Sequence, residues 1–109
     1  MPVAKVLVVD DSRTELMFLS DLLRQHGMQV RTAEGAEAAM RSLAEDLPDL
    51  ILLDVVIPGR NGFQLTRALQ RSPQYSAIPI ILCSSKDQET DRVWGLRQGA
   101  RDYVTKPVD

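Results

Sequence analysis

The sequence predicts a single α/β domain in which five parallel strands form a doubly wound sheet with helices on both faces. Two observations lead to this fold class. Short apolar runs alternate strictly with segments whose apolar residues recur at helical spacing, and the series begins and ends with a strand-like run. Such alternation with short loops requires parallel strands joined by right-handed crossovers. The length of 109 residues suits one domain, and a hydrophobic share of 44% suits a core of its own.

The first strand and the first helix follow from the opening residues. Residues 5–10 are a β-branched apolar run, typical of a strand that is buried on both faces. Ser12 and Glu15 form a capping-box pattern, which predicts the start of a helix. Leucines then recur at helical spacing: Leu16, Leu19, Leu22 and Leu23. Gly27 is the expected stop of this helix, with His26 as its C-terminal cap.

The middle of the chain continues the alternation. A weaker second strand is expected at residues 28–33 and a helix at about 36–45, which Pro48 ends. The apolar stripe of that helix has four members: Ala36, Ala39, Met40 and Leu43. Residues 50–54 are expected to form the most apolar strand of the chain, and a loop follows at 55–59.

The last elements complete the pattern. A third helix is expected at about 63–70 and a fourth strand at 78–83, with Pro79 tolerated near its start. A fourth helix at 87–98 and a short fifth strand at 101–105 follow. Together these elements give five strands with four helices between them.

A doubly wound sheet that ends on its fifth strand has one face short of a helix. We therefore expect a fifth helix beyond Asp109, or else a partner that covers this face. We expect residues 1–109 to belong to one domain.

Composition and charge exclude several classes of protein. The 13 Lys and Arg residues against 15 Asp and Glu give a net charge of −2, unlike the strongly basic surface of a stand-alone nucleic-acid binder. The longest uncharged apolar run, 50–53, is far too short to span a bilayer, and the N-terminus has no apolar signal region. The only cysteine, Cys83, cannot form an internal disulfide and is expected to be a buried strand residue. We expect a cytoplasmic protein without membrane or direct nucleic-acid contact.

Polar residues stand at the ends of four predicted strands. Ligands of open parallel sheets bind beyond the carboxyl ends of the strands, where the strand order reverses. With a strand order of 2-1-3-4-5, three carboxylates, two hydroxyls and one ammonium would meet at one edge. They belong to Asp10-Asp11, Asp54, Ser84-Ser85 and Lys106.

Such a cluster needs a cation. Two like charges about 4 Å apart repel by roughly 4 kcal/mol at an effective dielectric constant near 20, and one lysine cannot balance three acids. Carboxylate oxygens suit Mg²⁺, which commonly bridges carboxylate and phosphate. The ion and Lys106 would together accommodate a phosphoryl group, with a hydroxyl from the fourth strand as a further donor. The chemistry implied is phosphoryl transfer onto a carboxylate.

Helix capping is the structural alternative to metal binding for these acids. Asp11 could be only a helix cap, although Ser12 and Glu15 already supply a capping-box pattern. Asp54 cannot cap a nearby helix, because it lies between apolar residues and the next helix begins about eight residues later. An unpaired carboxylate in such a stretch is costly to keep ionised.

The other candidates are weaker when taken singly. Lys106 would ordinarily be a solvated surface lysine, but Pro107 favours extended geometry at this position. Ser84 alone is typical of a turn or cap, and Tyr103 alone is typical of packing. Trp94 is interpreted as packing or as a partner surface on the fourth helix.

Taken in order, these motifs resemble the receiver domain of two-component response regulators over essentially the whole chain. The matching segments are Val-Val-Asp10-Asp11-Ser, Leu-Leu-Asp54 with Pro58-Gly59 and Asn61-Gly62, Ile-Leu-Cys-Ser84-Ser85-Lys, and Gly99-Ala100-Arg-Asp-Tyr103-Val-Thr-Lys106-Pro107. The resemblance implies a flavodoxin-like sheet of order 2-1-3-4-5. It also implies a sensor histidine kinase whose phosphohistidine is the phosphoryl donor. The family catalyses only its own phosphorylation and dephosphorylation, so a turnover enzyme is not expected.

The resemblance also assigns roles by position. Asp54 would be the phosphoacceptor, and Asp10 and Asp11 would bind Mg²⁺ with Asp54 and the backbone carbonyl of Val56. Lys106 would contact the phosphoryl group.

Three further roles concern the switch. Ser84 would be the switch hydroxyl and Tyr103 the aromatic side chain that swings inward. The bond from Lys106 to Pro107 is commonly cis in this family. A change around the fourth helix and fifth strand, with a dimer through that face, is the expected output.

Within the family, residues 85–95 and 98–109 are similar to the chemosensory regulators of twitching motility, which act on type IV pili. Val56 and Lys86 stand two residues beyond Asp54 and Ser84, where side chains of the family modulate dephosphorylation. The sequence therefore leaves the lifetime of the phosphorylated state open.

Three other functions share features with this sequence. A receiver-like binding module that works without phosphorylation is the main alternative, and the complete acid set argues against it. A phosphatase of the haloacid-dehalogenase type would need an acid two residues after its nucleophile, but Ser12 stands two residues after Asp10. A flavin site is disfavoured, because Asp10 and Asp11 would repel the phosphate of the cofactor.

Overall fold

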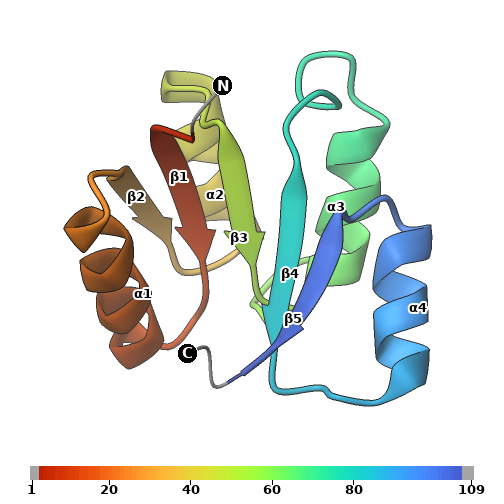
Figure 1. Ribbon diagram of the computed structural model, residues 1–109. Helices are drawn as coiled ribbons and strands as arrows, with labels where there is room; N and C mark the ends of the chain where they lie inside the picture. Colours follow the sequence, from red (N-terminus) through yellow and green to blue (C-terminus); the bar gives the residue numbers. More distant parts are fainter. Residues whose placement is uncertain (1–2, 107–109) are drawn as a thin grey trace.

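Five parallel strands form one sheet of order β2-β1-β3-β4-β5 in a computed structural model that describes residues 3–106 (Figure 1). This confirms the predicted fold class and strand order. The strands are β1 (Lys5–Val9), β2 (Gln29–Ala33), β3 (Leu50–Leu53), β4 (Ile80–Ser84) and β5 (Asp102–Thr105). The helices are α1 (Arg13–Gln25), α2 (Ala36–Glu45), α3 (Gly62–Gln70) and α4 (Glu89–Arg97).

Several boundaries differ from the predicted ones for local reasons. β4 begins at Ile80 rather than at residue 78, because Pro79 has no N–H to donate to a ladder, and it extends through Ser84. α3 begins one residue early, at Gly62, because Asn61 caps it in a reciprocal box with Gln64. His26 is the C-cap of α1, as predicted.

Two apolar layers lie on the two faces of the sheet. On one face α2 and α3 pack against alternate strand residues, among them Leu7, Leu53 and Leu82. On the other face α1 contributes Leu16 and Leu19, which pack on β1. The central strands are thus buried on both faces, which explains their almost continuous apolar sequence.

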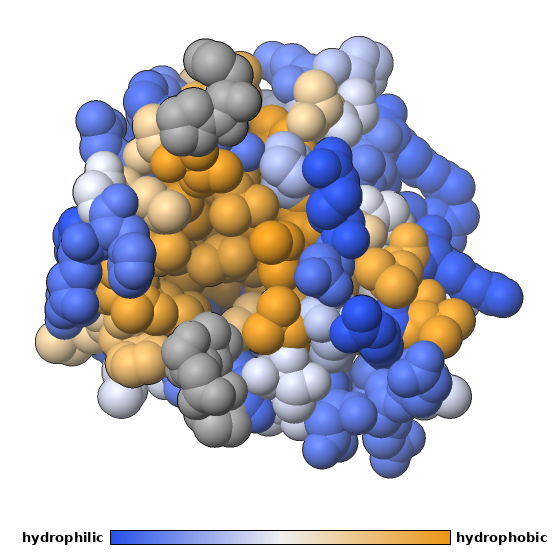
Figure 2. Space-filling model, in the orientation of Figure 1, coloured by the Kyte–Doolittle hydropathy of each residue, from blue (hydrophilic) through white to orange (hydrophobic). Residues whose placement is uncertain are grey.

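The face that carries α1 is covered only in part. The register places Val8, Leu52 and Ile81 side by side on this face. Val8 is buried under α1, whereas Leu52 and Ile81 are only half-buried. Figure 2 shows the corresponding patch of apolar side chains at the centre of this face. The fifth helix expected beyond Asp109 to cover it stays a prediction.

No helix within residues 3–106 is both long enough and apolar enough to cross a membrane.

Candidate functional site

Two neighbouring strands place a pair of carboxylates side by side. Val9 and Leu53 are directly paired in the register, so Asp10 and Asp54 follow at the same edge of the sheet. The backbone N–H of Asp54 donates to the carbonyl of Val9 over 2.9 Å, which extends the ladder to the site. One carboxylate oxygen from each of these acids and one from the exposed Asp11 all lie within 4.8 Å of one another. The predicted convergence of the three acids is therefore present.

Lys106 connects two of the three acids. Its Nζ lies 2.5 Å from Oδ2 of Asp10 and 3.1 Å from Oδ2 of Asp54. The lysine follows β5, and its backbone N–H donates to the carbonyl of Ser84 over 2.9 Å. Because β4 separates β5 from β3, the long lysine side chain spans the end of β4 to reach the acids.

The site is largely removed from solvent. The side chains of Asp10, Asp54 and Lys106 are 3%, 11% and 12% exposed. Burial alone would lower the pKa of Lys106, but hydrogen bonds to Asp10 and Asp54 outweigh it, and the pKa lies above its usual value. The lysine is therefore a fixed positive charge, and three acids against one lysine still leave an excess of negative charge.

The donor set fits a hard divalent cation. Carboxylate oxygens from Asp10, Asp11 and Asp54 are close enough to coordinate one ion together. Backbone N–H groups also hold two of these acids: Oδ1 of Asp10 accepts the N–H of Ser12 at 2.9 Å, and Oδ1 of Asp54 accepts the N–H of Val56 at 3.3 Å. These bonds fix the orientation of both carboxyl groups.

The capping box predicted for α1 forms only by half. Ser12 Oγ accepts the N–H of Glu15 at 3.3 Å, as a capping box requires. The N–H of Ser12 donates to Asp10 instead of to the Glu15 carboxylate. Asp10 is closer along the chain and already oriented by β1, so it takes the bond.

Ser84 and Tyr103 are linked through the backbone of Lys86. Ser84 is fully buried, and its Oγ accepts the N–H of Lys86 at 3.2 Å. The hydroxyl of Tyr103 donates to the carbonyl of Lys86 at 2.6 Å. The tyrosine is buried, which raises its pKa, so its ring already lies inward in this structure. Sequence reasoning named both side chains but missed Lys86 as the link between them.

Gly62 was also missed as a site residue. Its N–H donates to the carbonyl of Val55 at 2.7 Å, which brings the start of α3 directly behind Asp54. A Cβ at this position would lie 2.2 Å from the carbonyl oxygen of Asp54. The Asn61-Gly62 pair was named only as part of the family resemblance, although a side chain at Gly62 would have no room beside the backbone of Asp54.

Two predicted site features are not tested by the geometry. Val56 is exposed, and its carbonyl stays a predicted metal ligand. Pro107, with the expected cis bond, lies outside the described residues.

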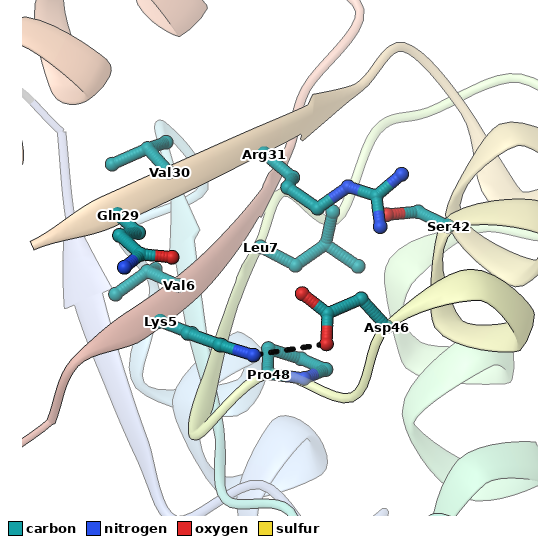
Figure 3. A pocket seen from close by; sticks show the side chains of 9 residues that line it. All are labelled: Lys5, Val6, Leu7, Gln29, Val30, Arg31, Ser42, Asp46 and Pro48. Atoms are coloured by element: carbon teal, nitrogen blue, oxygen red, sulfur yellow. Dashed lines mark hydrogen bonds and ion pairs between the residues drawn. The ribbon is translucent and has the colours of Figure 1, made fainter.

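A pocket elsewhere in the protein is separate from this cluster. It is a hollow of about 290 Å³ lined by residues of β1, β2 and α2 and of the segment after α2. Figure 3 shows these side chains, among them Lys5 and Asp46, which form an ion pair. The paired atoms lie 3.0 Å apart. Leu7 is the lining residue of β1 nearest to Asp10 and stands three residues before it, so roughly 10 Å of strand lies between this pocket and the carboxylates.

Comparison with known proteins agrees with this geometry. The response regulator receiver domain family matches residues 6–109. The chain is 53% identical over 106 residues to the protein PilH of Pseudomonas aeruginosa, and the match covers 97% of this chain and 88% of PilH.

Solved structures show the same likeness. The chemotaxis response regulator CheY4 of Vibrio cholerae has a TM-score of 0.91 at 30% identity, over 99% of this chain and 90% of that one. A response-regulator structure from Chloroflexus aurantiacus has a TM-score of 0.93 at 30% identity, over 99% and 88%. By its sheet order, its acidic cluster and these similarities, the chain belongs to the receiver domains of two-component response regulators.

Proposed function

We propose that this receiver domain accepts a phosphoryl group on Asp54 from the phosphohistidine of a sensor histidine kinase, in a Mg²⁺-dependent reaction that it catalyses itself. The observation that supports this most is the buried Lys106 ammonium between Asp10 and Asp54. A fixed cation beside a carboxylate nucleophile favours a reaction in which negative charge arrives with the phosphoryl group.

The proposed transfer forms one bond and breaks one. A carboxylate oxygen of Asp54 attacks phosphorus, the P–N bond to the kinase histidine breaks, and its electron pair stays on the ring nitrogen, which is then protonated. The product is an acyl phosphate, which water hydrolyses to inorganic phosphate and the free carboxylate. Asp10, Asp11 and Asp54 would hold Mg²⁺ with the carbonyl of Val56, and the ion would neutralise charge on the phosphoryl oxygens. Lys106 Nζ, 3.1 Å from Asp54, would steady the same oxygens.

The proposed output begins at Ser84. A phosphoryl group on Asp54 would attract the Ser84 hydroxyl. The hydrogen bond that the N–H of Lys86 donates to Ser84 Oγ would then break. Because Tyr103 binds the carbonyl of the same residue, the loop before α4 and the tyrosine would adjust together. Arg92 of α4 donates to the carbonyl of Tyr103 at 3.0 Å, which links this change to α4 and β5.

The central experiment adds acetyl phosphate and Mg²⁺ to the protein and measures its intact mass. We expect one added phosphoryl group in the wild type and none in Asp54→Asn. Asp49→Asn is the matched control, because it makes the same chemical change at an aspartate outside the cluster and should be phosphorylated normally. Absence of the adduct from the wild type, together with partner binding that is insensitive to Asp54→Asn, would favour the phosphorylation-independent binding module.

A second experiment tests the switch. Trp94 lies on α4 and is 49% exposed, so its fluorescence can report movement of that helix. Ser84→Ala should still accept the phosphoryl group but should lose most of the fluorescence change. If phosphorylation changes the Trp94 signal equally in both proteins, the proposed route through Ser84 is wrong.

We further propose a cytoplasmic role in the control of twitching motility, supported by the similarity to PilH and by the motifs of residues 85–109. Expression of this chain in a Pseudomonas aeruginosa strain that lacks PilH should restore the wild-type twitching zone, whereas Asp54→Asn should not. Equal zones with both chains would contradict a phosphorylation-dependent role. A dimer through the α4 and β5 face stays part of this proposal, and light scattering with and without acetyl phosphate would test it.

A further inference from the structure

The charges of this chain are unevenly distributed along the sequence. No Asp or Glu occurs in residues 55–86, although the protein has 15 acidic residues in all. The same segment carries Arg60, Arg67, Arg71 and Lys86. It contains α3, which is therefore a helix without any acidic side chain, unlike α1, α2 and α4.

Three of these cations form one surface, which we call the arginine face: Arg60, Arg67 and Arg71. All three are exposed, and together with Gln64 and Ala68 they line a shallow hollow of about 250 Å³. The hollow follows one side of α3, while Leu65 and Leu69 on the opposite side are buried in the core. Helical spacing thus separates a core side from a purely cationic side.

The arginine face has no ion-pair partner in the part of the chain that the structure describes. Four of the seven other arginines pair with carboxylates: Arg13 with Glu34, Arg31 with Glu45, Arg41 with Glu37 and Arg92 with Asp102. Within residues 3–106, none of the three members of the arginine face forms an ion pair. Arg67 and Arg71, the C-cap residue of α3, are moreover four residues apart, a spacing at which like charges repel. A protein of net charge −2 therefore concentrates cations without an ion-pair partner at one place.

We propose that the arginine face is a docking surface for an acidic segment of a partner protein, one that presents several carboxylates along a helix or extended strand. Guanidinium groups match carboxylates in planar, bidentate hydrogen bonds, and removal of like-charge repulsion would favour the complex. This proposal goes beyond phosphorylation of Asp54 and does not depend on it.

Other anionic partners fit this surface less well. The residues that line the hollow include no aromatic side chain on which a base could stack and no large apolar side chain that could enter a bilayer. The negative net charge would also oppose nonspecific attachment to the long, uniformly negative surfaces of DNA or a membrane. A short acidic segment meets the local cations without this repulsion.

The test uses fluorescence anisotropy with a fluorescein-labelled, alanine-based helical peptide that carries glutamates four residues apart. The reference probe is the same peptide with glutamines. We expect the glutamate peptide to bind the wild type about fivefold more tightly than the glutamine peptide at low salt, and this preference to fall as salt is raised.

The double variant R67Q/R71Q should weaken binding of the glutamate peptide about fivefold, because two charge-assisted contacts are lost. The matched control R13Q/R24Q removes the same charge from α1, which packs on the opposite face of the sheet, and should change binding less than about twofold. Thermal unfolding of both variants checks that each remains folded.

Three results would overturn the proposal. The first is equal weakening by both double variants, which would show an effect of bulk charge only. The second is a wild type that does not distinguish the glutamate from the glutamine peptide. The third is tighter binding of a single-stranded oligonucleotide or of phosphatidylglycerol vesicles than of the glutamate peptide, again lost in R67Q/R71Q, which would assign the arginine face to a different class of partner.

Discussion

Replacing Gly62 with alanine should disturb the fold and the site together. The added Cβ would lie 2.2 Å from the carbonyl oxygen of Asp54 and 2.7 Å from Cα of Val55. Both atoms belong to the backbone, so no flexible side chain can move aside. Because non-bonded heavy atoms prefer separations of about 3.5 Å, the start of α3 must retreat by roughly 1 Å.

The retreat has a calculable cost. It breaks or stretches the 2.7 Å hydrogen bond from Gly62 N–H to the carbonyl of Val55, which contributes about 1 kcal/mol. It also displaces the buried Leu65 and Thr66, and such overpacking costs about 1–3 kcal/mol. The free energy of unfolding should fall by about 2–4 kcal/mol, a large part of the roughly 5–15 kcal/mol typical of a domain. At about 4 °C per kcal/mol, Tm should fall by roughly 8–16 °C.

Urea and thermal unfolding followed by circular dichroism would measure this loss. Gly27→Ala is the matched control, because Gly27 has a φ of +83° but nothing within 4 Å of its added Cβ. It should lose only about 1 kcal/mol through backbone strain. Below its melting range, Gly62→Ala should also accept phosphate from acetyl phosphate more slowly than Gly27→Ala, since the displaced backbone carries Asp54. Equal stability losses in the two variants would refute the steric reasoning.

Three further predictions concern other parts of the molecule. Asp49 accepts two backbone N–H groups at the start of β1, which lower its pKa below 3.8, so Asp49→Asn should lower Tm at pH 7. The difference in Tm between wild type and Asp49→Asn should disappear as pH falls from 3.8 through the folded-state pKa. A Tm difference that stays constant over this pH range would contradict the prediction. Burial raises the pKa of the Cys83 thiol to about 11. At pH 8, Ellman's reagent should therefore label the folded protein roughly a hundredfold more slowly than the urea-unfolded protein, because the thiolate is the reacting form. Similar labelling rates would show an accessible thiol. Gly95→Ala would place a Cβ 2.7 Å from Cδ1 of Leu82 and 3.0 Å from Cδ2 of Tyr103. This overpacking should lower the free energy of unfolding, measured by urea titration, by about 1–3 kcal/mol. Unchanged stability would mean that α4 does not pack this closely on the sheet.

The convergence of acids was predictable because it depends on few quantities. Parallel strands of similar length end at one edge of a sheet, so polar residues that directly follow apolar runs must meet there. Asp10 and Asp54 each follow such a run directly, and Lys106 follows the short fifth strand, which ends at Thr105. Strand order then decided only that the lysine must cross the end of β4, which a long, unbranched side chain can do.

Hydrogen-bond choices at the site were not predictable in the same way. The carboxylates of Glu15 and Asp10 are both chemically able to accept a hydrogen bond from the N–H of Ser12. In the structure Asp10 accepts it, because β1 places its carboxylate beside that N–H. The shared contact of Ser84 and Tyr103 with the backbone of Lys86 depends on the path of the loop before α4. No periodicity in the sequence encodes such a path.

By itself, the sequence determined the alternation of strands and helices, the positions of the acids at strand ends and the cationic composition of residues 55–86, because each of these is a local pattern of side-chain type. Only the tertiary structure decided how closely α3 approaches Asp54 and which hydrogen bond each carboxylate accepts. It also decided that the three arginines of the arginine face form no ion pair within residues 3–106. These properties depend on distances of a few ångströms between segments far apart in the chain. Such distances are set by packing of the whole core rather than by any one segment.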